Sequence, residues 1–212
     1  LKSTIYPLME GASRFCEQWL IENPKHPGEL ITAPSTSPEN EYLTDKGYHG
    51  TTCYGGTADL AIIRELFENT QQARRILNIK PDKQLNNTLK RLHPYTIGSD
   101  GDLNEWYYDW KDYDPQHRHQ SHLIGLYPGM HLQRHAIQTK DSSLLKAAKQ
   151  TLIQKGDEST GWSTGWRINL WARLGEGKHA YEIYHRLLSY VSPEEYHGPD
   201  AVHRGGTYPN LF

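Results

Sequence analysis

The stretch ADLAIIRELFENTQQARRIL (residues 58–77) carries apolar side chains at helical spacing, namely Leu60, Ile63, Phe67 and Leu77. Such a stripe predicts an amphipathic helix, and the arginines near its end suit the negative end of the helix dipole. Valine occurs only twice in the chain, whereas leucine is abundant, and this balance also favours helices over strands. We therefore predict an all-α fold.

Similar signals predict further helices on both sides of this one. We expect them over residues 6–20, 82–92, 120–126, 142–155, 165–174 and 180–191. Their ends are marked by Pro7, Gly156, Gly175 and Pro193. No repeat and no linker composition divides the chain, so we expect a single domain.

Apolar residues are scarce for a domain of this length. Ala, Val, Ile, Leu, Met, Phe, Trp, Cys and Gly together make up about 38% of the 212 residues, against roughly 45 to 50% in an average soluble domain. Two explanations stay open. The chain has a large polar binding surface, or it is a segment of a larger domain whose other part completes the core.

Composition argues against several classes of partner. The formal net charge is −2, and the basic residues form no stripe, so we expect no nucleic acid. No run approaches the roughly 20 apolar residues that cross a membrane, so we expect no membrane partner. Cys16 and Cys53 form no disulfide framework and are read as free thiols. The start of the chain has neither Met nor a signal peptide, which suggests a processed or truncated chain.

Two sets of residues resemble metal sites only weakly. His117, His119 and His122 lie close in sequence, but no HExxH or CxxC pattern accompanies them. Asp100, Asp102 and Asn104 imitate the start of a calcium loop, yet the glycine and the final glutamate of that loop are absent. We predict no metal and no cofactor.

Glu105 lies within GDLNEWYYDW (residues 101–110), among four large aromatic rings. Apolar rings around a carboxyl would raise its pKa, as a general acid needs. The alternative is that Glu105 faces solvent while the rings face a core. Loops rich in Trp, Tyr, His and acids suit sugars, because flat rings stack on pyranoses, so we expect Trp106 to contact the substrate.

Several segments together resemble glycoside hydrolase family 95, whose members are α-L-fucosidases and related α-L-galactosidases. They are YPLMEGASRF, APSTSPENEY, IIRELFENT, RLHPYTIGSDGDLNEWYYDW, HRHQSHLIGLYPG, TGWSTGWRINLWARLGEGKHAYEIY and GGTYPNLF. The resemblance runs in order along essentially the whole chain. It departs from the usual pattern at His93 and Asn104, which leaves the glutamate in place.

The resemblance implies part of an (α/α)6 barrel and an inverting hydrolysis without metal. It makes Glu105 the acid that protonates the leaving oxygen. Arg118 and His119 match an RH pair expected to bind fucose hydroxyls, and Glu39 or Glu41 of the SPENE segment is expected to do the same. The implied substrate is a glycan with terminal, α-1,2-linked fucose, and the implied location is the periplasm or outside the cell.

An ordinary inverting enzyme needs a second carboxylate about 6.5 to 9.5 Å from the acid. The family instead uses an asparagine in NxN and an aspartate in QIDGNFG, and neither motif is in this sequence. We therefore expect a middle segment of the catalytic domain, inactive alone, which needs the remainder of that domain as a partner. Two alternatives stay open: a fragment that binds sugar without cleaving it, and a polysaccharide lyase on a similar fold.

Overall fold

The structure is a computed structural model and describes residues 1–190 and 207. About half of these residues are helical. The helices are α1 (Ile5–Trp19), α2 (Thr57–Ile76), α3 (Lys83–Arg91), α4 (His131–Thr139), α5 (Ser143–Lys155), α6 (Gly161–Arg173) and α7 (Gly177–Leu187), with the 3-10 helix η1 (Ser121–Gly125). Every predicted helix has a counterpart, although residues 120–126 form only the short η1. Residue 191 of the last prediction lies outside the described part.

Helix α4 is the helix that the sequence did not predict. Its sequence HLQRHAIQT has no apolar stripe, and Leu132 is its one buried residue. At its start, the backbone N–H groups of Met130 and His131 donate to Glu65 of α2, over 3.0 and 3.1 Å. Because this cap comes from another helix, the local sequence carries no sign of it.

Short antiparallel strands occupy the loops between the helices, so the all-α prediction was incomplete. They are β1 (Leu20–Glu22), β2 (Leu30–Thr32), β3 (Ser35–Thr36), β4 (Tyr42–Leu43), β5 (His49–Gly50), β6 (Thr52–Cys53) and β7 (Lys111–Asp112). Strand β1 pairs with β2, β3 with β6, and β4 lies between β5 and β7. The last sheet sets Asp112 directly opposite Tyr42.

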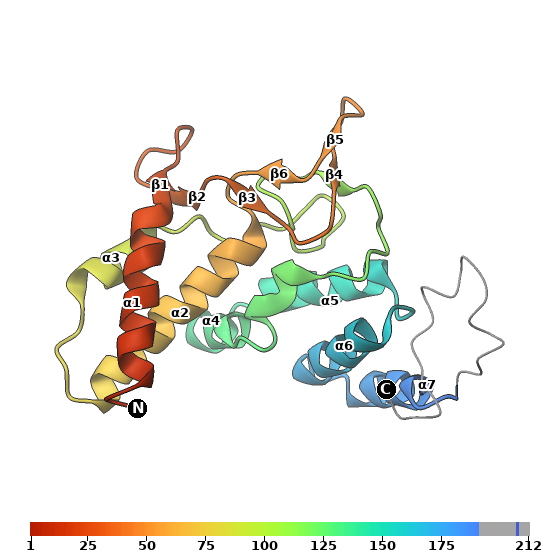
Figure 1. Cartoon of the computed structure of the whole chain (residues 1–212). Helices are drawn as coiled ribbons and strands as arrows, with labels where there is room; N and C mark the ends of the chain where they lie inside the picture. The colour runs from red at the N-terminus through yellow and green to blue at the C-terminus, as the bar shows by residue number, and fades with distance from the viewer. Residues whose placement is uncertain (191–206, 208–212) are drawn as a thin grey trace.

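Two separate apolar clusters hold the helices together (Figure 1). One joins α1, α2 and α3 around Phe67, which is fully buried. The other joins η1 with α4, α5, α6 and α7 around Leu152 and Leu170. The strands run along one end of the helices, above both groups in Figure 1. The loops that carry chemistry are therefore gathered at one end of the structure.

Helix α1 presents an apolar face to solvent. Ile5, Leu8 and Phe15 are 54%, 70% and 65% exposed, although α1 packs its other side on α2 through Cys16. Buried area is the main stabilising contribution to a helix of this length, so such a face is unusual unless something covers it. Among the described helices, none has the length and apolar character needed to span a membrane.

Candidate active site around Glu105

Glu105 lies in the segment between α3 and β7, and its backbone is fixed on both sides. The N–H of Thr57 at the start of α2 donates to the Glu105 carbonyl over 3.1 Å. The Thr57 hydroxyl donates to the Asn104 carbonyl over 2.6 Å. On the other side, Leu103 N–H donates to Thr151 Oγ1 of α5 over 3.0 Å. These bonds hold the segment between the two helical groups.

The Glu105 side chain turns inward and is only 4% exposed. Asn40 Nδ2 donates to its Oε1 over 3.0 Å. Its Oε2 lies 3.1 Å from His122 Nδ1 and 3.4 Å from Lys155 Nζ. The solvent-facing alternative for Glu105 is therefore wrong, and the carboxyl group contacts polar and charged side chains that the sequence did not predict.

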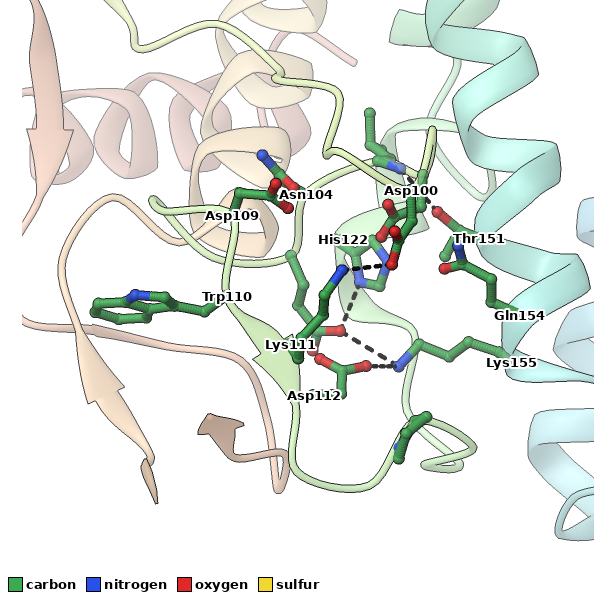
Figure 2. Close-up of a pocket in the computed structure, with 14 residues that line it drawn as sticks. Asp100, Asn104, Asp109, Trp110, Lys111, Asp112, His122, Thr151, Gln154 and Lys155 are labelled. Carbon is green, nitrogen blue, oxygen red and sulfur yellow. Dashed lines mark hydrogen bonds and ion pairs between the residues drawn. The ribbon is translucent and has the colours of Figure 1, made fainter. Parts of the chain in front are cut away.

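A cluster of four ionisable groups results, three of them buried and Asp112 half-buried. Lys155 reaches from the end of α5 to Asp112 of β7, with 2.5 Å between Nζ and Oδ2. Figure 2 shows Lys155, Asp112 and His122 converging from three different elements. We call Glu105, Asp112, His122 and Lys155 the acid cluster.

The neighbouring rings pack on one another. Trp106 is 1% exposed and donates from Nε1 to Asp112 Oδ1 over 3.2 Å. Trp110 stacks on Tyr42 with 4.4 Å between ring centroids, and in Figure 2 it points away from the acid cluster. The prediction of Trp106 as a substrate platform is corrected: its ring has no free face, and it supports Asp112 instead.

The electrostatics of Glu105 also correct the sequence prediction. Burial opposes ionisation, but the charges of His122 and Lys155, with the His122 and Ser37 contacts, outweigh it and hold the pKa of Glu105 well below its usual range. Burial and the nearby Glu105 charge raise the pKa of Asp112, although Lys155 acts in the opposite direction. Of the two carboxyls, Glu105 is the one that stays ionised to lower pH.

The predicted sugar-binding residues form a second, more exposed group. Arg118 forms an ion pair with Glu39, and His119 Nε2 lies 3.0 Å from the same carboxylate oxygen. Glu39 holds a left-handed backbone (φ 58°), which non-glycine residues rarely adopt and which occurs often at functional sites. The structure thus brings Glu39 against Arg118 and His119, which lie about 80 positions further along the sequence. We call Glu39, Arg118 and His119 the RH group.

Glu41 does not join the RH group. Its carboxylate lies 2.6 Å from His49 Nδ1 of β5, and the His49 ring stacks on Tyr113 with 4.9 Å between centroids. Asn40, between the two glutamates, turns to Glu105. Of the two acids in SPENE, Glu39 is therefore the better candidate for substrate binding.

The RH group is connected to α6 through its backbone. Arg167 is fully buried and donates from Nη1 to Ser163 Oγ over 2.6 Å. Ser163 Oγ in turn donates to the Arg118 carbonyl over 2.5 Å. Ser163 therefore helps to hold the RH pair in place.

A cavity of about 330 Å³ lies beside the acid cluster. Its walls are Asp100, Asp102, Leu103, Asn104, Glu105, Asp109, Trp110, Lys111, Asp112, Pro115, His122, Thr151, Gln154 and Lys155. The RH group does not line this cavity. The acid cluster thus lines this cavity, and the RH group lies outside its walls.

The three histidines of HRHQSH diverge in their contacts. His122 faces Glu105, and His119 faces Glu39. His117 Nδ1 accepts from the His119 N–H over 3.2 Å. Within residues 1–190 and 207, no three His, Cys, Asp or Glu side chains are grouped so that they could hold a metal ion.

Comparison with known proteins decides the family. The family model described as "Glycosyl hydrolase family 95 catalytic domain" matches residues 1–212 of the chain. The chain belongs to this family. The family resemblance drawn from the sequence motifs is thereby confirmed.

Relatives of the family 95 chain include α-fucosidases from plants and fungi. It is 38% identical over 216 residues to "Alpha-L-fucosidase 2" of Arabidopsis thaliana, with all of this chain and 24% of the relative aligned. It is 32% identical to "Probable alpha-fucosidase A" of Aspergillus oryzae, with 74% of this chain and 22% of the relative aligned. A protein of the same name from Aspergillus niger is 30% identical, with 85% and 23% aligned. The chain thus spans about a quarter of the length of these relatives.

Two members of the acid cluster in this family 95 chain escaped sequence reasoning. Lys155 ends a helix and precedes a glycine, so it resembled an ordinary last-turn lysine. Asp112 belongs to KDYD, a short charged sequence with no motif. No local pattern marks either residue. Their contact depends on the end of α5 lying beside β7, and only the fold shows this.

Proposed function

We propose that the complete protein is an inverting α-L-fucosidase in which Glu105 donates a proton to the leaving glycosidic oxygen. The observation that carries this proposal is the Glu105 carboxyl group, buried and held by contacts from three separate elements, within a chain of family 95. A general acid needs such a fixed position, because proton transfer requires hydrogen-bond reach. The family match favours hydrolysis over the lyase alternative.

The charges around Glu105 stabilise its conjugate base. When Glu105 gives up its proton, the resulting carboxylate lies against Lys155 and His122, which makes donation more favourable. The same charges reduce the fraction of Glu105 that holds a proton before the reaction. The balance between these two effects sets the working pH, and it depends on the partners of Lys155.

The RH group is proposed to bind fucose hydroxyls. Arg118 and Glu39 have side chains 40% and 57% exposed, so both can exchange their mutual contact for a ligand. Guanidinium donors and a carboxylate acceptor together match the alternating donors and acceptors of a sugar. We propose a terminal, α-1,2-linked fucose as the substrate, with L-galactose as the alternative sugar.

Further parts of the catalytic domain are proposed to complete the site. This chain contains neither an NxN nor a QIDGNFG sequence, and the relatives are about four times longer than the aligned segment. We propose that the rest of the domain supplies the group that activates water, closes the (α/α)6 barrel, and covers Ile5, Leu8 and Phe15 of α1. These 212 residues alone would then bind sugar at most, which is the second candidate function.

The test is fucose release by the complete protein. The protein is incubated with an α-1,2-fucosyl oligosaccharide, and proton NMR follows the anomer that forms first. We expect β-L-fucose to appear before mutarotation, and Glu105→Gln to remove the activity. Release of α-L-fucose, or no release at all, would contradict the proposed function. The isolated 212-residue chain, assayed in parallel, should release no fucose.

A further inference from the structure

The Lys155 ammonium is shared unequally between two carboxylates. Its Nζ lies 2.5 Å from Asp112 Oδ2 and 3.4 Å from Glu105 Oε2. Glu105 and Lys155 are buried, each with a side chain 4% exposed, and Asp112 is half-buried, with a side chain 16% exposed. At this depth water screens the charges weakly, so each change of charge in the cluster acts strongly on the others.

Asp112 is fixed in this position by both of its oxygens. Oδ2 faces Lys155, and Oδ1 accepts from Trp106 Nε1 over 3.2 Å. The backbone is held by the pairing of β7 with β4, in which Asp112 lies opposite Tyr42. Asp112 therefore stays beside Lys155, because turning to solvent would break these contacts.

From this arrangement we propose that Asp112 and Lys155 are positioning residues that set how readily Glu105 holds its proton. Lys155 favours the Glu105 carboxylate, and Asp112 draws Lys155 toward itself and away from Glu105. Asp112 thereby keeps a protonated Glu105 attainable. The inference rests on the proposed function, since it concerns the same acid, and it assigns roles to two residues outside the family motifs described above.

The other groups that face Glu105 are known from the structure. They are Ser37 and Asn40 before β4, Cys53 of β6 and His122 of η1, together with Asp112 and Lys155 themselves. Asn40 and Ser37 carry no charge, and burial raises the pKa of the Cys53 thiol to about 11, which keeps it neutral. His122 is charged only when protonated. Among these groups, Lys155 and Asp112 are the two whose removal changes the charge near Glu105 in opposite directions.

The test compares the pH dependence of kcat/KM for the complete protein and its variants on an α-1,2-fucosyl oligosaccharide. Asp112→Asn leaves Glu105 as the one carboxylate beside Lys155, so we expect the alkaline limb to move down by about one pH unit or more. Lys155→Met removes the cation, so we expect the limb to move up by a similar amount. Lys149→Met makes the same change on α5 at a lysine that pairs with Glu176, and should leave the limb unmoved.

Opposite shifts are the result that a purely structural role would not give. Coincident alkaline limbs in wild type, Asp112→Asn and Lys155→Met, or shifts in the same direction, would overturn the inference. Should Lys155→Met fail to fold, Lys155→Gln takes its place, with the same expected direction.

A second measurement separates this inference from the proposed function. The infrared carboxyl band, taken as the difference between each variant and its Glu105→Gln counterpart, reports proton uptake by Glu105 without any substrate. We expect the titration midpoint to fall in Asp112→Asn and to rise in Lys155→Met. If the wild-type protein released no fucose but these midpoints moved as expected, the proposed function would fail and the inference would stand. Unmoved midpoints in an active enzyme would reject the inference alone.

Discussion

Asn40 donates a 3.0 Å hydrogen bond to Glu105 across 65 residues of sequence. Because Asn40 is 1% exposed, this bond fixes Oε1 of the acid, while Lys155 lies beside Oε2. We predict that Asn40→Ala in the complete protein lowers kcat about 10-fold or more, since a misplaced acid transfers its proton poorly. Asn40→Asp should also move the alkaline limb of the pH profile to higher pH, because an additional carboxylate beside Glu105 opposes its ionisation. A wild-type kcat for Asn40→Ala in steady-state kinetics would show that Asn40 does not position Glu105.

Gly98 lies against the segment that carries Glu105. A Cβ at this position would lie 2.7 Å from Asn104 Oδ1 and Asp109 Oδ1 and 2.8 Å from Asp102 Oδ1. We predict that Gly98→Ala lowers the free energy of unfolding by about 1 to 3 kcal/mol, because three polar groups must move.

Gly165 of α6 provides the matched control for Gly98. A Cβ there meets nothing within 4 Å, and alanine favours a helix interior by about 0.5 to 1 kcal/mol over glycine. Gly165→Ala should therefore leave stability equal or slightly higher in chemical denaturation. A loss for Gly165→Ala as large as that for Gly98→Ala would show that the close contacts of Gly98 are not the cause.

Ser163 supports the RH group through its bond to the Arg118 carbonyl. Ser163→Ala leaves that carbonyl and the buried Arg167 without this partner, so we predict a loss of about 1 to 3 kcal/mol in unfolding free energy. If Arg118 and His119 bind fucose, KM should rise in Ser163→Ala with kcat little changed. His119→Ala should raise KM by roughly 10-fold, the effect of one hydrogen bond to a charged or strongly polar group. An unchanged KM in His119→Ala would place the sugar elsewhere.

The depressed pKa of Glu105 also predicts how stability depends on pH. A carboxyl group whose pKa is lower in the folded than in the unfolded protein stabilises the fold above its unfolded pKa, which is about 4.3 for glutamate. This stabilisation is lost as the pH falls through the folded pKa. We therefore expect the unfolding free energies of wild type and Glu105→Gln to differ at pH 6, and this difference to shrink progressively as the pH falls below about 4.3 toward the folded pKa of Glu105. A constant difference over this range would contradict an ionised Glu105 in the fold.

The sequence predicted the helices well because their signals are local. The α2 stripe of Leu60, Ile63 and Phe67 becomes the buried face of that helix. Helix α4 was missed because its cap, Glu65, comes from α2. The strands were missed because most are only two residues long and carry no periodic pattern.

The sequence singled out Glu105 as a candidate acid, but it did not reveal the charged groups around that carboxyl. The neighbours of Glu105 in sequence are aromatic, and a decapeptide cannot reveal that Lys155, 50 residues away, lies 3.4 Å from its carboxylate. The contact with Asn40 was equally hidden, since it lies between the two glutamates of SPENE that attracted attention. Long-range contacts decide the charge of a buried group, and these depend on the fold.

The leaving-group dependence of catalysis tests the role of Glu105 most directly. In the complete protein, Glu105→Gln is compared with wild type on an α-fucosyl sugar, whose leaving group needs a proton, and on an aryl α-L-fucoside with an acidic phenol, whose leaving group does not. We predict a loss of about 10² to 10⁴ in kcat/KM for the sugar and less than about 10-fold for the aryl fucoside. Glu22→Gln, an exposed glutamate of β1 paired with Arg91, should change neither. Equal losses on both substrates would contradict proton donation by Glu105.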